Sequence, residues 1–169
     1  MTRLIVPRSQ DHLPQCVEAL AVVHAAVGYP VVWPTDPSEW LTGEGFLGAW
    51  VATDETVVQG HIGLKRSLLD DGSSVGEIFR LFVVPDAQGT GIGRSLLALG
   101  VARSHAHGLL PMLRVLLPES RDVASWYERL GWRLHSTRLA THGPLASRGY
   151  SIATYLLRDS GSTGGDGSG

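Results

Sequence analysis

A glycine-rich segment between an apolar run and a helical pattern constrains the fold of this chain more than any other feature. The run VGEIFRLFVVP, residues 75–85, is nearly continuous in apolar and β-branched residues, which predicts a strand covered on both faces. The segment DAQGTGIGR follows it and leads directly into a helical pattern at 92–108. Glycine at this density weakens regular structure, so its presence indicates that something must approach the main chain closely, where a side chain would be in the way. A strand, a glycine turn and a helix N-terminus together indicate a phosphate-binding site.

Two common phosphate loops do not fit this segment. A nucleoside-triphosphate loop requires Gly-Lys-Ser/Thr, whereas residues 93–95 read Gly-Arg-Ser with a different spacing from the other glycines. A dinucleotide-binding loop requires G-x-G-x-x-G, and the third glycine of GTGIG at 89–93 comes one residue early. No acidic residue ends a second parallel strand about 20 residues further on, as that fold also requires. The phosphate must therefore be held in another way.

Hydrophobic periodicity and turn residues give the order of elements along the chain. Apolar residues at helical spacing predict a helix over 11–28, with Asp11 as its N-cap and Gly28 as its end. The expected strands are 3–9, the hairpin 46–67, 75–85, 112–118, 133–143 and 148–159, and the expected helices are 11–28, a short piece at 36–41, 92–108 and 120–132. Hairpins beside one strand–helix–strand crossover predict an α/β (α+β) fold, a mixed sheet with helices on both faces.

Composition and charge narrow the class of protein. A chain of 169 residues with 43% apolar residues predicts one domain over 1–158, and the tail 159–169, which has no apolar residue, is expected to be disordered. The net charge of −2 and a single lysine argue against nucleic acid, and no apolar run approaches the ~20 residues of a membrane span. One cysteine and an N-terminus unlike a signal peptide predict a cytoplasmic protein. The lack of basic runs leaves small molecules or peptides as partners, and a monomer or homodimer is expected.

The glycine loop and a second motif resemble the GNAT superfamily of acyl-CoA-dependent N-acyltransferases. The family's cofactor signature, Gln/Arg-x-x-Gly-x-Gly/Ala, matches Gln88, Gly91 and Gly93, and SWYERLGW at 125–132 resembles its later helix end. The order of elements extends the resemblance over residues 3–158. It implies a GNAT-like mixed, mostly antiparallel sheet of six to seven strands, with acetyl-CoA as co-substrate and no metal.

The resemblance assigns the loop to the pyrophosphate of CoA. Successive backbone N–H groups and the positive end of a helix dipole hold an anion without lysine or metal. The expected phosphate contacts are Gln88, Gly89, Thr90, Gly91, Ile92, Gly93 and, through its charge, Arg94. As in the family, main-chain groups of Leu81, Phe82 and Val83 would pair with the pantetheine arm like an added strand. An N–H near Val83 would polarise the thioester carbonyl.

Two positions near the second motif follow from the same resemblance. Tyr127 stands where the family has a phenol next to the sulfur of CoA, and its hydroxyl would protonate the departing thiolate. The alternative is that Tyr127 only packs between helix and sheet. Ser120 stands where the family often has Asn at the start of this helix. Serine suits an N-cap, but the contact that such an asparagine makes with the pantetheine arm does not carry over directly.

The acceptor amine must lose a proton before it attacks, since a lysine-like amine has a pKa of about 10.4. Glu77 opens the central strand on the same face as Phe79 and is one candidate base. In some histone-type members of the family the carboxylate lies two residues further along, at the position of Phe79. His61 on the neighbouring strand is the second candidate, and water alone is the third. The structural alternatives are a strand-end surface carboxylate and a half-buried strand histidine.

The first loop and the last hairpin are expected to shape the acceptor site. The aromatic, proline-rich segment YPVVWPTDPSEW either covers the core or lines a binding site. The candidate contacts are Tyr29, Trp33, His24 and His142. The pair His105-x-His107 lacks a third ligand with suitable spacing, so no metal is expected.

The predicted function is acetyl transfer from acetyl-CoA to a primary amine of a small molecule or peptide, by direct attack in a ternary complex. The alternative is a non-catalytic acyl-CoA-binding or sensing module that keeps the loop but lacks a base. The loop points to the cofactor, whereas the residues expected around the acceptor do not distinguish a metabolite from a protein N-terminus.

Overall fold

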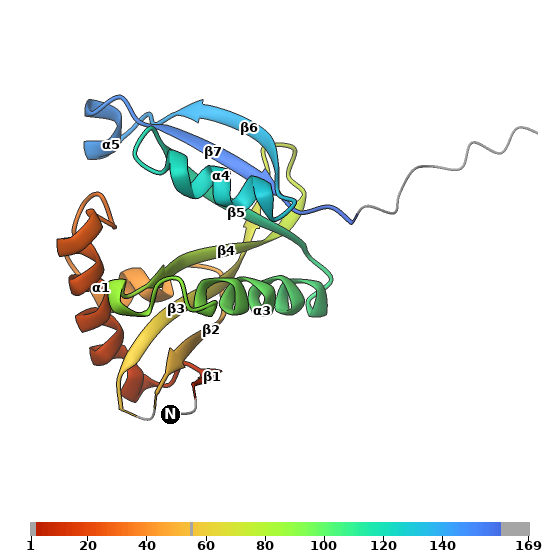
Figure 1. Cartoon of the computed structure of the whole chain (residues 1–169). Coiled ribbons are helices and arrows are strands. Elements are labelled where there is room, and N and C mark those ends of the chain that lie inside the picture. Colours follow the sequence, from red (N-terminus) through yellow and green to blue (C-terminus); the bar gives the residue numbers. More distant parts are fainter. Residues whose placement is uncertain (1–2, 55, 160–169) are drawn as a thin grey trace, which may run out of the picture.

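A seven-stranded sheet runs through the molecule, with helices on both of its faces (Figure 1). The computed structural model describes residues 3–54 and 56–159. The strands are β1 (Leu4–Pro7), β2 (Phe46–Thr53), β3 (Val58–Leu68), β4 (Ser74–Val83), β5 (Leu110–Leu117), β6 (Arg133–Leu139) and β7 (Ser151–Leu156). The helices are η1 (Gln10–His12), α1 (Leu13–Val27), α2 (Pro37–Thr42), η2 (Pro85–Ala87), α3 (Ile92–Ala106), α4 (Arg121–Arg129) and α5 (Gly143–Ser147). The predicted tail lies outside the described residues except for Asp159.

The strand order β1-β2-β3-β4-β5-β7-β6 confirms the predicted mixed, mostly antiparallel sheet. Every neighbouring pair is antiparallel except β4 and β5. This parallel pair is joined only at its beginning, from Val75 opposite Leu110 to Glu77 opposite Met112. Beyond Glu77, β4 continues along β3 while β5 continues along β7. The remainder of β4 therefore has a free edge, which leads to the glycine loop and α3 (Figure 1).

Hydrophobic cores lie on both faces of the sheet. On one face, α3 and α4 bury Leu96 and Ala124 with Ile62 of β3. On the other face, α1 buries Cys16 with Val51 of β2. Successive residues of a strand point to opposite faces, so one sheet supplies side chains to both cores. This arrangement confirms the prediction of helices on both faces.

A bulge distorts β4 where its second edge is free. Gly63 of β3 pairs with Phe79 and His61 pairs with Phe82, so one residue of β3 opposes two of β4. Arg80, inside the bulge, has φ of +53° and is the one non-glycine residue with positive φ in the described ranges. This backbone conformation costs a residue with a side chain about 1–2 kcal/mol. Its neighbours must therefore supply the interactions that hold it.

The helix termini follow local signals in most cases. Gly28 ends α1 in the left-handed region at φ of +72°, as predicted, and Asp36 caps α2 by accepting the amide of Glu39 at 3.0 Å. The predicted N-cap Asp11 is wrong: it lies in η1, and α1 begins at Leu13, where a proline in the first turn suits a helix start. The sequence pattern also predicts no helix at α5, because five residues are too few to show a helical period.

Candidate active site

The glycine loop presents a row of backbone N–H groups at the N-terminus of α3. Gly89 and Gly91 have φ of +74° and +88°, where a side chain would be strained. In the part of the chain that the structure describes, no protein group accepts a hydrogen bond from the amides of residues 89–94. A Cβ at either glycine would meet nothing within 4 Å, so the outer side of the loop is open. These amides, next to a helix N-terminus, form a surface that can bind an anion.

Side chains of the loop hold it against the end of β4. Gln88 Nε2 donates to the carbonyl of Val83 at 3.2 Å, and the hydroxyl of Thr90 donates to the carbonyl of Ala87. Ile92 is buried in the core under α3. The side chains of Gln88 and Thr90 are therefore used inside the protein, and the loop offers mainly its backbone to a ligand.

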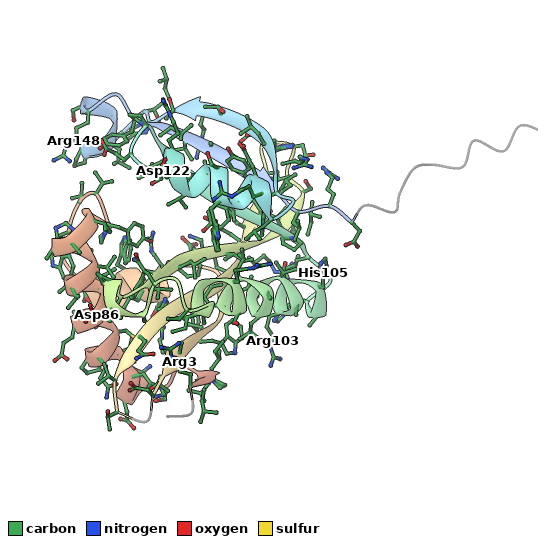
Figure 2. The ribbon with its side chains drawn as sticks, viewed as in Figure 1. Arg3, Asp86, Arg103, His105, Asp122 and Arg148 are labelled. Atoms are coloured by element: carbon green, nitrogen blue, oxygen red, sulfur yellow. The ribbon has the colours of Figure 1, made fainter. Side chains whose placement is uncertain are left out.

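The charges around the loop are mixed. A Cβ on Gly93 would touch Trp126 of α4 at 3.8 Å, so the loop and α4 lie close together. Arg94 is exposed on the first turn of α3. Asp86 precedes the loop and Asp122 lies in the first turn of α4 (Figure 2). Backbone dipoles, rather than a cluster of cations, would therefore bind a phosphate here.

The free edge of β4 offers main-chain groups beside the loop. The amide of Val84 donates to the carbonyl of Gln59 on β3 at 2.9 Å. Because successive residues of a strand direct their polar groups to opposite edges, Val83 and Leu81 face the free edge. Phe82 pairs with β3 and buries its side chain in the core under α1. Of the three residues predicted to contact pantetheine, Leu81 and Val83 direct main-chain groups to the edge where an added strand would lie, with the carbonyl of Val83 already accepting from Gln88.

Tyr127 of α4 is buried, with 8% of its surface exposed. Its ring lies 5.1 Å from the ring of Trp126 and 6.1 Å from that of Trp132. Burial, with a further contribution from Tyr29, raises the pKa of the Tyr127 phenol well above its usual value. The phenol is therefore protonated at neutral pH. The ring packs in the core, which is the predicted alternative, and proton donation to CoA stays a prediction.

Ser120 takes the N-cap position of α4, as predicted, but its hydroxyl makes no capping hydrogen bond. The capping preference of serine comes from such a bond to the first-turn amides. A hydroxyl that does not cap the helix remains available to another partner. A contact of Ser120 with the pantetheine arm stays a prediction.

Glu77 is almost completely buried and carries two ion pairs. Arg114 of β5 donates to its Oε2 at 2.7 Å, and the Lys65 ammonium of β3 lies 3.8 Å from the same oxygen. Within the described ranges, no hydrogen bond engages the second oxygen, Oε1. Both cations reach Glu77 from neighbouring strands, at the point where β4 and β5 separate. The predicted base is thus anchored by one oxygen and has one oxygen left for water or substrate.

His61 is completely buried, and both of its ring nitrogens have partners. Nδ1 lies 2.8 Å from the carbonyl of Arg80, and Nε2 lies 2.8 Å from an Nη atom of Arg8. Since the carbonyl can only accept and the guanidinium can only donate, the imidazole is neutral, with its proton on Nδ1. Burial, reinforced by the two nearby guanidinium groups, lowers the pKa of His61 to about 3. Neither nitrogen is placed to take a proton from a substrate.

Tyr29, Trp40 and Arg80 form a cluster over the bulge of β4. The ring of Tyr29 lies 6.1 Å from that of Trp40 and 6.5 Å from that of Phe82. The Arg80 guanidinium stacks 3.5 Å from the centre of the Trp40 ring. Burial raises the pKa of Tyr29, and the nearby Arg80 partly offsets this.

Arg80 interrupts an otherwise apolar strand, and the sequence suggested that it could simply pair with an acid. That interruption was the available signal, since a central strand covered on both faces rarely carries an unpaired charge. An ion pair with an acid is the role that the residue type suggests. Among the described residues, the structure shows no such ion pair for Arg80.

The other predicted acceptor contacts fall into two places. His24 Nδ1 lies 2.8 Å from the carbonyl of Pro30, and its ring lies 5.3 Å from that of Trp33, so both hold the loop after α1. His142 is exposed before α5 and lies 2.8 Å from the hydroxyl of Thr141. The structure therefore brings His24 and Trp33 together but places His142 on the separate β6–β7 connection. All of them remain predictions as substrate contacts.

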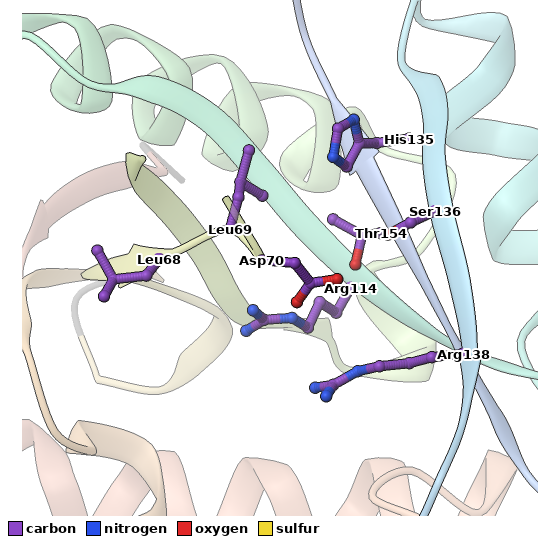
Figure 3. A pocket seen from close by; sticks show the side chains of 8 residues that line it. All are labelled: Leu68, Leu69, Asp70, Arg114, His135, Ser136, Arg138 and Thr154. Carbon is purple, nitrogen blue, oxygen red and sulfur yellow. The ribbon is translucent and has the colours of Figure 1, made fainter. Parts of the chain in front are cut away.

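A shallow hollow lies over the β5–β7–β6 part of the sheet (Figure 3). Arg114, Arg138 and His135 line it together with Asp70 of the β3–β4 turn. Leu113, next to Arg114, points into the core under α3 and α4, so the hollow is on the opposite face. It reaches the predicted site only through Arg114, which binds Glu77. The loop, the free edge of β4 and Tyr127 are not part of it.

Two predicted absences concern metal and membrane. In residues 3–54 and 56–159, no group of three or more His, Cys, Asp and Glu side chains is arranged to hold a metal ion. His105 lies near the C-terminus of α3, at the end of that helix away from the glycine loop (Figure 2). No helix in these ranges has the length and apolar character needed to cross a membrane. Cytoplasmic location and oligomeric state stay predictions.

Solved structures share this fold. The ribosomal-protein-S18-alanine N-acetyltransferase from Escherichia coli superposes with a TM-score of 0.67 at 20% identity, covering 92% of this chain and 93% of that one. Arabidopsis thaliana NAA60 in complex with a bisubstrate analogue gives 0.70 at 16% identity, covering 92% and 97%. At these identities the likeness establishes the fold alone.

Sequence relatives and a family model identify the family. The mycothiol acetyltransferase of Cellulomonas flavigena is 34% identical over 134 residues, and that of Geodermatophilus obscurus is 32% identical over 98 residues. These matches cover 75% and 57% of this chain but only 38% and 31% of the relatives, so the chain spans about a third of their length. The acetyltransferase (GNAT) domain model matches residues 46–134, which is more than half of the chain. The chain therefore belongs to the GNAT acetyltransferase family.

Proposed function

We propose that this chain is an N-acetyltransferase that moves an acetyl group from acetyl-CoA to a primary amine. The observation that carries the proposal is the row of amides at residues 89–94, for which no protein acceptor is found in the described ranges. Such amides at a helix N-terminus fit the pyrophosphate of CoA. The free edge of β4 ends beside them and fits the extended pantetheine arm.

The chemistry follows from the placement of these groups. The amine nitrogen attacks the thioester carbonyl carbon, and the main-chain N–H of Val83 on the free edge would donate to the oxyanion that forms. The carbon–sulfur bond then breaks, leaving an amide and a thiolate. The Tyr127 hydroxyl gives its proton to the sulfur, so CoA leaves as the free thiol, and the phenolate then takes a proton back from solvent.

Glu77 is the better of the two candidate bases. Its Oε1 has no hydrogen-bond partner in the described part of the chain, whereas both nitrogens of His61 are occupied. The amine would pass its proton to Glu77 through water, since Glu77 is buried where the strands separate. Arg114 and Lys65 would hold the carboxylate in place during this transfer.

The acceptor class is a small molecule or a peptide. The relatives named mycothiol acetyltransferase favour a small molecule, and the solved structures named for alanine N-acetylation favour a peptide end. The aromatic cluster of Tyr29 and Trp40 fits either an apolar group or the first side chain of a peptide.

A second candidate function is a non-catalytic acyl-CoA-binding module. The specific observation in its favour is that His61 is unavailable and Glu77 is held by two cations. Such a module would bind acetyl-CoA through the same loop and transfer nothing. It differs from the enzyme in one measurable outcome, the release of free thiol.

The test is a screen for thiol release over amines, aminoglycosides, amino acids and peptides, with acetyl-CoA and longer acyl-CoAs. We expect release with at least one acceptor, and we expect Tyr127→Phe to lower kcat by about 100-fold or more while CoA still binds. Tyr127→Phe with full turnover would remove Tyr127 from the mechanism. No release with any acceptor, while acetyl-CoA still raises the melting temperature, would support the binding module.

A further inference from the structure

A closed set of polar contacts lies under the bulge of β4. An Nη atom of Arg8 lies 2.8 Å from Nε2 of His61, and Nδ1 of His61 lies 2.8 Å from the carbonyl of Arg80. Both arginines also contact the C-terminal end of α2. We call Arg8, His61, Arg80 and the last three residues of α2, Trp40 to Thr42, the bulge clamp. It joins four separate elements of the chain, around the point where β4 is distorted.

The two arginines bind the C-terminus of α2. Arg8 donates to the carbonyl of Leu41 at 3.0 Å and to the hydroxyl of Thr42 at 2.9 Å. Arg80 Nε donates to the carbonyl of Trp40 at 3.1 Å, and its guanidinium stacks on the Trp40 ring. The last carbonyls of a helix have no partner within the helix and carry partial negative charge. Two guanidinium groups therefore satisfy these carbonyls and fix α2 to β4.

The bulge clamp holds a strained residue. Arg80 keeps φ of +53° although it has a Cβ, which costs about 1–2 kcal/mol in the left-handed region. The carbonyl of Arg80 is held by His61, which is itself fixed by stacking on Phe82 at 5.3 Å with an interplanar angle of 13°. The side chain of Arg80 is held by Trp40. Contacts at both ends of the residue oppose its relaxation to a regular strand.

The conformation of Arg80 determines which way the next residues point. A bulge adds one residue to the strand. If the bulge were lost, the residues after it would shift by one position, and their amides would point to the opposite edge of the strand. Leu81 and Val83, which now face the free edge, would then turn toward β3. The thioester would lose the main-chain groups that we assign to it.

We propose that the bulge clamp positions the thioester-binding edge of β4, and that His61 acts as a positioning residue within it. For its effect on catalysis, this inference rests on the proposed function. It also ties α2, which follows the aromatic loop, to the strand that would hold the thioester. The same contacts would thus fix both the aromatic loop before α2 and the orientation of the thioester on β4.

The first test compares three substitutions at one position. Arg80→Gly, Arg80→Asn and Arg80→Val all remove the guanidinium, so they differ mainly in how well they tolerate positive φ. Glycine adopts this conformation without strain, asparagine tolerates it, and a β-branched residue does not. We expect kcat/KM of Arg80→Val to be about 5- to 30-fold below that of Arg80→Gly, with Arg80→Asn between them. Equal kcat/KM in all three variants would overturn the proposal.

The second test removes the histidine in two backgrounds. His61→Phe keeps an aromatic ring for stacking on Phe82 but removes both polar contacts. We expect a larger loss of kcat/KM when Arg80 is present than in the R80G background, because glycine holds the bulge without His61. An equal loss in both backgrounds would overturn the proposal. If His61→Phe fails to fold, the comparison of the three Arg80 variants still tests the proposal.

A pH profile separates positioning from base catalysis. The charged groups facing His61 are Arg8 after β1 and Arg80 on β4, and Cys16 of α1 lies close enough to Arg8 to interact with it. With these surroundings His61 stays neutral above pH 4, so kcat/KM should keep the same pH dependence between pH 5 and 9 in His61→Phe. Loss of an inflection near pH 6 to 7 in the variant would instead identify His61 as the base.

Hydrogen exchange gives a readout that needs no acceptor. The amide of Val84 donates to Gln59 next to the bulge, and we expect it to exchange faster in Arg80→Val than in Arg80→Gly. Affinity for CoA, measured on the same proteins by calorimetry, should follow the same order. If wild-type protein transfers no acetyl group, the proposed function fails, while these two measurements still test the clamp. Identical exchange in the two variants would refute the clamp itself.

Discussion

Gly91 offers the sharpest test of the phosphate-binding loop, because the chain contains a matched control on the same helix. Gly91 directly precedes α3 with φ of +88°, and Gly108 follows α3 with φ of +68°. A Cβ at either position would meet nothing within 4 Å. Gly91→Ala and Gly108→Ala therefore introduce the same kind of backbone strain and no steric clash, at opposite ends of one helix.

The magnitude follows from the backbone alone. A residue with a Cβ pays about 1–2 kcal/mol in the left-handed region, and each variant should lose up to this much stability. For a chain of this length that corresponds to a fall in Tm of about 2–8 °C. Only in Gly91→Ala does the strained residue belong to the row of free amides. Where that open loop relaxes in the absence of CoA, the Tm of Gly91→Ala falls by less than that of Gly108→Ala, and the relieved part of the cost appears in binding instead, raising Kd for CoA by up to about 5- to 30-fold.

The assay is calorimetric titration with CoA, together with thermal denaturation with and without CoA. We expect both variants to melt below the wild type and only Gly91→Ala to lose affinity. Equal losses of CoA affinity in both variants would show that the effect is global. Unchanged affinity in Gly91→Ala, although its Tm falls less than that of Gly108→Ala, would refute the assignment of the loop to the pyrophosphate.

Three further predictions concern the rest of the site. The folded pKa of His61 is about 3, below its usual 6.5, so the unfolded chain binds a proton that the folded chain does not between these values. The unfolding free energy should therefore fall as pH is lowered from about 6.5, by up to about 1.4 kcal/mol per pH unit. Urea titrations from pH 7 to 4 should show this slope in wild type and a weaker one in His61→Phe, and identical slopes would contradict it. Gly63→Ala should lower the free energy of unfolding, measured in urea, by about 1–3 kcal/mol, because the new Cβ would lie 2.7 Å from the Phe79 ring. A variant as stable as the wild type would mean that the ring moves freely. Arg94→Ala should raise Kd for CoA by no more than about fivefold, and less at high salt, because Arg94 is exposed; a larger loss would make it a main phosphate ligand.

Local signals were sufficient for the glycine loop. Gly89 and Gly91 have positive φ because of turn geometry within a few residues, and the helix that follows is apolar at helical spacing. The strand before it is apolar on both faces because both faces are covered. The order of elements and the mixed sheet followed for the same reason. Gly28 was correctly identified as the end of α1, since a C-cap acts on the nearest turn of its own helix.

Contacts between distant residues decided the roles of the charged side chains. Glu77 is anchored by Arg114, 37 residues away on β5, and this pairing exists only because β4 and β5 run parallel for three residue pairs. His61 is enclosed by Arg8, 53 residues away, and by the carbonyl of Arg80 across a bulged register. A single slip in that register would have left the imidazole elsewhere, and no periodicity records such a slip.

The sequence by itself determined the backbone site, and the tertiary structure decided the side-chain chemistry. Glycine spacing and a helix start specify a row of amides locally, so the loop at residues 89–94 could be found from the chain alone. Whether Glu77 is available and whether His61 can titrate depends on burial and on partners from other strands. Those properties arise only when the sheet assembles, because pKa values and ion pairs are set by groups that are close in space and distant in sequence.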